Sequence, residues 1–159
     1  MTINIRKIEE TDISPVIGLI RGLAEFEDLS QFCEITGDKL REVMFGKAAF
    51  VRGLIAFDGD TPVGYAIFYP YFASFRGQRG IYLEDLYIDS NYRGEGLGER
   101  FIREIAREAA MEGACRIDFQ VLESNSPAIR FYEKLGAVRD DTERHFKFTD
   151  DAFQQLAAE

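Results

Sequence analysis

A glycine-rich stretch, RGEGLG at residues 93–98, decides which folds the chain can adopt. It follows a mostly apolar segment at residues 81–88 and opens a segment at residues 97–109 whose apolar residues recur at helical spacing. Glycine lets a backbone approach a ligand without a Cβ in the way, and a helix N-terminus carries roughly half a positive charge. The stretch therefore predicts a strand–loop–helix unit that holds a phosphate, although a plain tight turn would show the same glycines.

Two well-known phosphate loops do not match this stretch. A P-loop needs Gly-Lys-Ser/Thr, and no lysine occurs between Lys47 and Lys134. A dinucleotide-binding GxGxxG needs a third glycine at the position where this chain has Glu99. The pattern that is left is Arg-x-x-Gly-x-Gly over residues 93–98.

The rest of the chain predicts a mixed α/β sandwich in one domain, residues 1–159, because no repeat, low-complexity tract or linker interrupts it. An Asp-Gly step at residues 58–59 predicts a hairpin between two strands. The expected strands cover residues 3–5, 51–57, 63–69, 81–88, 117–121 and 144–148. The expected helices cover residues 13–24, 38–45 and 97–109, with a further helix capped by residues 124–127 and ending before Gly136, and a short one after Asp150.

Composition and charge exclude several classes of protein. With 46% hydrophobic and 30% charged residues, the chain has globular rather than disordered composition. Its 19 Lys+Arg against 28 Asp+Glu give a net charge of -9, which argues against duplex nucleic acid as a partner. We see no signal peptide or membrane span, and Cys33 and Cys115 have no CxxC spacing. We therefore expect a reduced, cytoplasmic protein, and one histidine with two cysteines predicts no zinc cluster.

Two motifs together resemble the GNAT superfamily of N-acetyltransferases. Residues 93–98 fit its Arg/Gln-x-x-Gly-x-Gly/Ala pattern for the pyrophosphate of coenzyme A, and residues 125–137, NSPAIRFYEKLGA, resemble its Asn-x-x-Ala-x-x-Phe-Tyr-x-x-x-Gly-Phe/Ala motif. One predicted helix and one predicted strand separate them, as in that superfamily. The resemblance implies a mostly antiparallel sheet that splays between strands 4 and 5, flanked by helices. It also implies acetyl-CoA as co-substrate.

A narrower resemblance points to the diamine (spermidine/spermine) and thialysine acetyltransferase branch. It rests on YLEDLYI at residues 82–88 and LAEFE at residues 23–27, and it covers Ile5 to about Ala137. It implies a homodimer that acetylates a primary amine of a small molecule by direct attack in a ternary complex. Residues 70–79, PYFASFRGQR, lack the acidic residue and tryptophan of the polyamine enzymes, which favours a thialysine-like or other short amino compound.

The resemblance also implies which residues bind acetyl-CoA. Backbone N–H groups near Leu86 and Ile88 would bind the acetyl carbonyl and the pantetheine arm. Asn125 would either contact coenzyme A or cap its own helix. The full set implied for the cofactor is Leu86, Tyr87, Ile88, Arg93, Gly94, Glu95, Gly96, Leu97, Gly98, Glu99, Asn125, Ala128 and Tyr132.

Two side chains are the candidates for catalysis. An alkylamine titrates near ~10.4, so at neutral pH only about one molecule in 2,500 is nucleophilic and its proton needs an acceptor. Glu84 lies in an apolar strand and is the candidate base, direct or through water; a structural ion pair at the strand's open end is the alternative. Tyr132 is the candidate acid that supports the departing thiolate, and a core tyrosine is the alternative.

The candidates for the substrate side are Phe26, Glu27, Phe75, Glu84 and Asp85. Glu27 would attract a cationic amine, unless it belongs to a solvated acidic face. Strand alternation predicts that Asp85 faces away from Glu84 and has a structural role. Two other functions stay open, namely a protein N-terminal or lysine acetyltransferase and a non-catalytic acyl-CoA sensor.

Overall fold

A five-stranded sheet in the order β1-β2-β3-β4-β5 forms the body of the first of two compact units, Met1–Gln120 and Val121–Glu159. The computed structural model describes residues 2–158. Neighbouring strands are antiparallel except for the parallel pair β4–β5. The strands are β1 Ile3–Lys7, β2 Arg52–Asp58, β3 Thr61–Ala73, β4 Gln78–Ile88 and β5 Ile117–Asp118.

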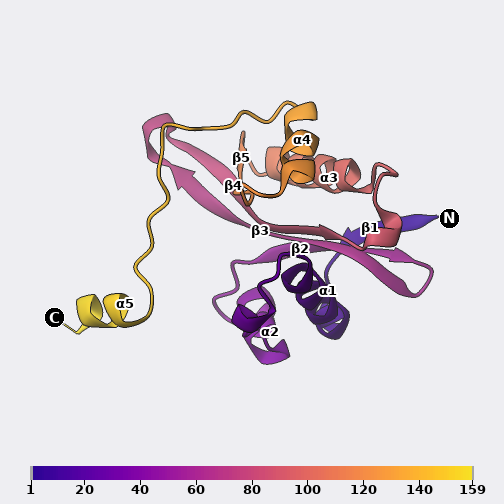
Figure 1. Ribbon diagram of the computed structural model, residues 1–159, viewed down its shortest axis with the longest axis horizontal. Helices are drawn as coiled ribbons and strands as arrows, with labels where there is room; N and C mark the ends of the chain where they lie inside the picture. Colours follow the sequence, from indigo (N-terminus) through magenta and orange to yellow (C-terminus); the bar gives the residue numbers. More distant parts are fainter. Residues whose placement is uncertain (1, 159) are drawn as a thin grey trace. The chain divides into compact units, whose positions relative to one another are not determined.

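Helices cover both faces of this sheet (Figure 1). Helices α1 (Ile13–Phe26) and α2 (Gly37–Phe45) lie on one face, and α3 (Leu97–Met111) lies on the other. Four short 3₁₀ turns complete the unit, at Glu10–Asp12, Ser30–Phe32, Ser74–Arg76 and Ser90–Tyr92. The sheet is therefore the middle of three layers. The loop that follows Ile88 connects it to α3.

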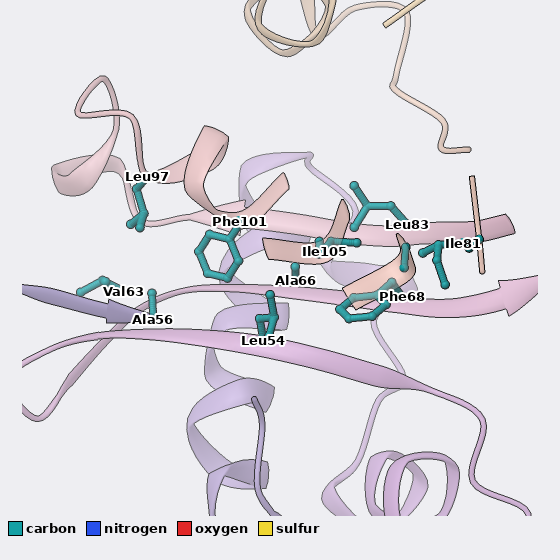
Figure 2. Packing of buried hydrophobic residues seen from close by; sticks show 12 residues of the cluster. Leu54, Ala56, Val63, Ala66, Phe68, Ile81, Leu83, Leu97, Phe101 and Ile105 are labelled. Carbon is teal, nitrogen blue, oxygen red and sulfur yellow. The ribbon is translucent and has the colours of Figure 1, made fainter. Parts of the chain in front are cut away.

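The α3 face of the sheet carries the larger apolar cluster, shown in Figure 2. Leu97, Phe101 and Ile105 recur every four residues along α3 and are at most 2% exposed. They pack on Leu54 and Phe68 of the central strands. The helical spacing seen in the sequence is thus the buried stripe that fixes α3, and with it the glycine loop, to the sheet.

Asp12 stands at the start of α1 without capping it. It is the N-cap residue, but its side chain makes no cap hydrogen bond to α1. Its carboxylate instead accepts two hydrogen bonds from Arg6, at 2.6 and 2.9 Å, and one from the backbone N–H of Glu9. The Arg6 guanidinium lowers the pKa of Asp12, although burial of the carboxyl opposes it. The pair joins β1 to the entry of α1.

The second unit contains α4 (Ser126–Lys134) and α5 (Asp150–Ala157). Asn125 caps α4 by accepting a hydrogen bond from the backbone N–H of Ala128, and Gly136, with φ +95°, follows the helix end. The predicted strand at 144–148 is wrong, because these residues have no strand structure. Alternating side chains do not make a strand unless a neighbour supplies the hydrogen bonds.

No helix within residues 2–158 has both the length and the apolar character needed to cross a bilayer. Strand β5 is also shorter than the predicted segment 117–121, since only Ile117 and Asp118 pair with β4.

Candidate active site

The edge of β4 that faces β5 is open over half its length. Strand β5 pairs with β4 only at Ile81 and Tyr82, and along residues 83–88 no strand pairs with that edge in the described part of the chain. The other edge is paired with β3 as far as Ile88. Every second residue of a strand directs its backbone N–H and C=O to the same edge. The splay therefore leaves backbone donors near Leu86 and Ile88 available to a ligand.

The glycine loop leads from this open edge into α3. Gly94 and Gly96 have φ values of +82° and +79°, and a Cβ at either position would meet no atom within 4 Å. Gly96 is the N-cap of α3 and provides no side-chain cap, while Arg100 N–H donates to its carbonyl. The first-turn N–H groups thus lack a side-chain acceptor at the cap, and no atom crowds the two loop glycines. These features fit a diphosphate.

Arg93 connects the loop to the end of β4 and to α1. Its Nε donates to the carbonyl of Ile88 at 2.8 Å, and its guanidinium lies 4.3 Å from the ring centre of Phe26 and 5.6 Å from that of Tyr87. Phe26, a predicted substrate residue, is half exposed and stacks on this arginine. The structure therefore brings a predicted cofactor residue and a predicted substrate residue into contact.

Three side chains in the loop and the first turn of α3 have different surroundings. Leu97 is buried in the α3 core, so only its backbone can meet a ligand. Glu99 accepts hydrogen bonds of 2.9 and 2.6 Å from Arg103 one turn later. Glu95 is exposed. The loop thus offers a ligand backbone groups more than side chains, and Gly98 lies in the same first turn as Leu97.

We expect Gly96→Ala to cost about 1–2 kcal/mol of unfolding free energy, because alanine is disfavoured at the left-handed φ of this residue. The predicted role of the loop in holding the diphosphate implies that the added methyl group also weakens acetyl-CoA binding. Urea denaturation and titration calorimetry measure the two effects. Gly18→Ala, inside α1 with no atom within 4 Å of the added Cβ, is the control and should stabilise by about 0.5–1 kcal/mol. Equal stability of wild type and Gly96→Ala would contradict the expectation.

A β-bulge in β4 corrects the predicted orientation of Asp85. Ile67 pairs with Asp85 and Phe68 pairs with Leu83, so Glu84 is one extra residue between consecutive partners. The bulge changes the phase of alternation, and the carboxylates of Glu84 and Asp85 reach tyrosines of the same face of β3. The prediction that Asp85 faces away from Glu84 is therefore wrong.

Two tyrosines of β3 hold these carboxylates. The hydroxyl of Tyr65 donates to Asp85 at 2.9 Å, and that of Tyr69 donates to Glu84 Oε2 at 3.0 Å. Tyr65 is fully buried and Glu84 is exposed. Neither tyrosine was among the residues predicted from the sequence.

The acidic groups on this face influence one another. Burial is the main cause that raises the pKa of Asp85 to about 6; the negative charges of Glu84 and Glu27 add to it, and the Tyr65 hydrogen bond opposes it. Burial also raises the pKa of Glu27. Asp85 thus has a structural bond to Tyr65 and an electrostatic link to the predicted substrate residues. Phe75, by contrast, is fully exposed at the tip of the β3–β4 hairpin, several residues along both strands from Glu84.

The raised pKa of Asp85 predicts a pH-dependent stability. Between pH 4 and 6 the folded protein keeps this proton while the unfolded chain, with a pKa near 3.8, loses it. The free energy of unfolding therefore falls as pH rises, by about 2 kcal/mol between pH 4 and 6 and by about 3 kcal/mol over the whole titration. Asp85→Asn removes the ionisation, so we expect the variant to exceed wild type by up to about 3 kcal/mol at pH 7 but not at pH 4. Urea denaturation at both pH values tests this, with the exposed Asp38→Asn as control.

The remaining predicted residues belong to α4. Asn125 and Ala128 are joined by the capping hydrogen bond, which supports the capping interpretation of Asn125 without testing contact with coenzyme A. Burial raises the pKa of Tyr132 to about 12, and its ring packs edge-on against Phe131 with centroids 4.9 Å apart. Tyr132 is therefore a protonated donor at neutral pH. Within residues 2–158, no three or more His, Cys, Asp or Glu side chains gather as metal ligands would.

The chain is similar in sequence to known acetyltransferases. Residues 22–137 match the Acetyltransferase (GNAT) family. The chain is 36% identical to a thialysine N-epsilon-acetyltransferase of Bos taurus, with 96% of each chain covered. It is 33% identical to an L-ornithine N5-acetyltransferase of Arabidopsis thaliana over 58% of this chain and 41% of the relative.

A solved structure shows the same fold. An integron cassette protein of V. cholerae superimposes with a TM-score of 0.84 at 20% identity, covering 100% of this chain and 99% of the other. The sheet order, the parallel β4–β5 pair and the family match confirm the fold predicted from the two motifs. The chain belongs to the GNAT family of acetyltransferases.

Proposed function

We propose that this protein is an acetyl-CoA-dependent N-acetyltransferase whose acceptor is a primary amine on a small amino compound such as thialysine. The observation that carries the proposal is the identity of 36% to a thialysine N-epsilon-acetyltransferase over 96% of both chains. The ornithine-acetylating relative supports an acceptor with an amine on a short side chain. Long polyamines fit less well, because residues 70–79 contain no acidic side chain.

The open edge of β4 and the glycine loop are the proposed site for acetyl-CoA, which supplies an activated acetyl thioester when bound. The loop N–H groups at the start of α3 would hold the diphosphate, and Arg93 would orient the loop through Ile88. The unpaired edge at Leu86 and Ile88 would orient the acetyl carbonyl and the pantetheine arm. Tyr87, Asn125 and Ala128 complete the proposed binding set.

Glu84 is the proposed base. It takes a proton from the acceptor ammonium, directly or through water, so that the amine nitrogen can form the new C–N bond. Glu27 and Asp85 on the same side add negative charge that attracts a cation, and Phe26 provides apolar surface. An exposed carboxylate at an unpaired bulge position is accessible to substrate.

Tyr132 is the proposed donor to the sulfur that leaves as the C–S bond breaks. A phenol with a pKa of about 12 keeps its proton at neutral pH. Full transfer to a thiolate, whose ordinary pKa is near ~8.5, would be uphill by about 5 kcal/mol. A hydrogen bond that strengthens as charge develops on the sulfur is sufficient.

We also propose that residues 1–159 form one GNAT domain, that the protein is a cytoplasmic homodimer, and that it needs no metal. The near-complete coverage of the bovine relative supports a single domain. Sedimentation analysis tests the dimer, for which a single species of 18.1 kDa would be the contradicting result.

The decisive experiment measures release of free coenzyme A from acetyl-CoA in the presence of single amines. We expect turnover with thialysine and with ornithine, and less with spermidine. Turnover only with peptides bearing a free N-terminus or lysine would favour a protein acetyltransferase. Acetyl-CoA binding by calorimetry without turnover on any acceptor would favour a sensor.

A further inference from the structure

The bulge in β4 leaves Glu84 without a backbone partner on β3. Its exposed side chain is held only by the bonds that it makes itself. Glu84 is the extra residue between Leu83 and Asp85, and its side chain is exposed. An exposed glutamate samples several rotamers unless a bond selects one. A base that must meet an amine at hydrogen-bond distance gains from having one position.

Tyr69 supplies such a bond. Its hydroxyl donates to Glu84 Oε2 at 3.0 Å, while Oε1 has no hydrogen bond to a described residue. A hydrogen bond to an ionised group is stronger than one between neutral groups. Burial and the interaction with Glu84 raise the pKa of the Tyr69 phenol, so it stays a donor at neutral pH. One oxygen of Glu84 is thus held while the other is left to accept a proton.

The ring of Tyr69 is itself held in place. It stacks on Tyr82 of β4, with centroids 5.4 Å apart and an angle of 28° between the planes. It also contacts Phe50 edge-on, with ring centroids 6.0 Å apart and an angle of 71° between the planes. Tyr69 and Tyr82 are also paired residues of the two strands. The two aromatic contacts fix the direction of the hydroxyl.

We infer that Tyr69 is a positioning residue for the transfer reaction, holding Glu84 through Oε2 so that Oε1 faces the acceptor amine. The inference rests on the proposed function of Glu84 as base. In this role Tyr69 bonds Glu84 rather than the amine or the thioester, so its effect passes through Glu84 alone. Tyr65, on the same face of β3, donates the corresponding hydrogen bond to the half-buried Asp85.

Tyr69→Phe keeps the ring and removes only the hydroxyl. We expect kcat with thialysine to fall about tenfold, the equivalent of one charge-assisted hydrogen bond, with acetyl-CoA affinity within twofold of wild type. Tyr82→Phe is the matched control, because this ring stacks on Tyr69 but no hydrogen bond joins it to Glu84 among the described residues. It should retain wild-type kcat. Thermal unfolding of both variants checks that the fold is intact.

A double-mutant cycle with Glu84→Gln separates positioning from a general structural effect. If Tyr69 acts through Glu84, Tyr69→Phe lowers kcat less than twofold further in the Glu84→Gln background. A tenfold loss in both backgrounds, or full activity of Tyr69→Phe beside an impaired Glu84→Gln, overturns the positioning role alone. Full activity of Glu84→Gln overturns the proposed base and this inference with it.

Discussion

Tyr132→Phe should lower kcat about a thousandfold while acetyl-CoA binds with nearly unchanged affinity. The phenyl ring keeps the contact with Phe131, so the helix should fold as in wild type. The substitution removes the hydroxyl that donates to the sulfur. Negative charge develops on that sulfur only as the C–S bond breaks. An interaction made only in the transition state affects kcat rather than ground-state binding.

Stopped-flow or steady-state measurement of coenzyme A release gives kcat, and calorimetry gives the affinity for acetyl-CoA. Tyr71→Phe is the matched control, because its hydroxyl bonds Asp118 on β5 and has no proposed part in the reaction. A Tyr132→Phe enzyme within threefold of wild-type kcat would remove Tyr132 from the proposed mechanism.

Glu84→Gln should also lower kcat/KM for the amine by about a hundredfold to a thousandfold near neutral pH. Glutamine retains the size of the side chain and can still accept the hydrogen bond from Tyr69, but it cannot take a proton. The remaining rate then depends on the small fraction of amine that is neutral in solution. We therefore expect log(kcat/KM) of the variant to rise with a slope of one up to the pKa of the amine, near ~10.

The pH–rate profile of coenzyme A release measures this slope. Glu104→Gln, which removes an exposed carboxylate paired with Arg107 on α3, is the control and should behave as wild type. A Glu84→Gln profile that coincides with the wild-type profile would show that another group, or solvent, takes the proton.

The parts of the site that follow from local sequence were predictable. The glycine loop, the amphipathic α3 and the Asn125 cap depend on residues within one or two turns of each other, and the structure has each of them. Local patterns reflect local backbone preferences, which the sequence states directly. The two motifs of the superfamily and their order along the chain could be recognised without knowledge of any tertiary contact.

The parts that depend on pairing between strands were not predicted. The bonds from Tyr65 to Asp85 and from Tyr69 to Glu84 follow from the register of β3 on β4. A sign of the bulge is nevertheless present in the sequence. Apolar residues that pack on α3 fall at odd numbers before Glu84 and at even numbers after Asp85, namely Ile81, Leu83, Leu86 and Ile88. Strict alternation cannot produce that change of phase.

The unpaired edge of β4 has a consequence for the aggregation and stability of the protein in solution. An edge that no strand pairs can bind another extended chain, and so invites self-association when nothing occupies it. A bound cofactor would close that row and also stabilise the fold, by about 2.7 kcal/mol at a hundred times its Kd. Purification and storage with coenzyme A should therefore suppress aggregation and raise Tm together.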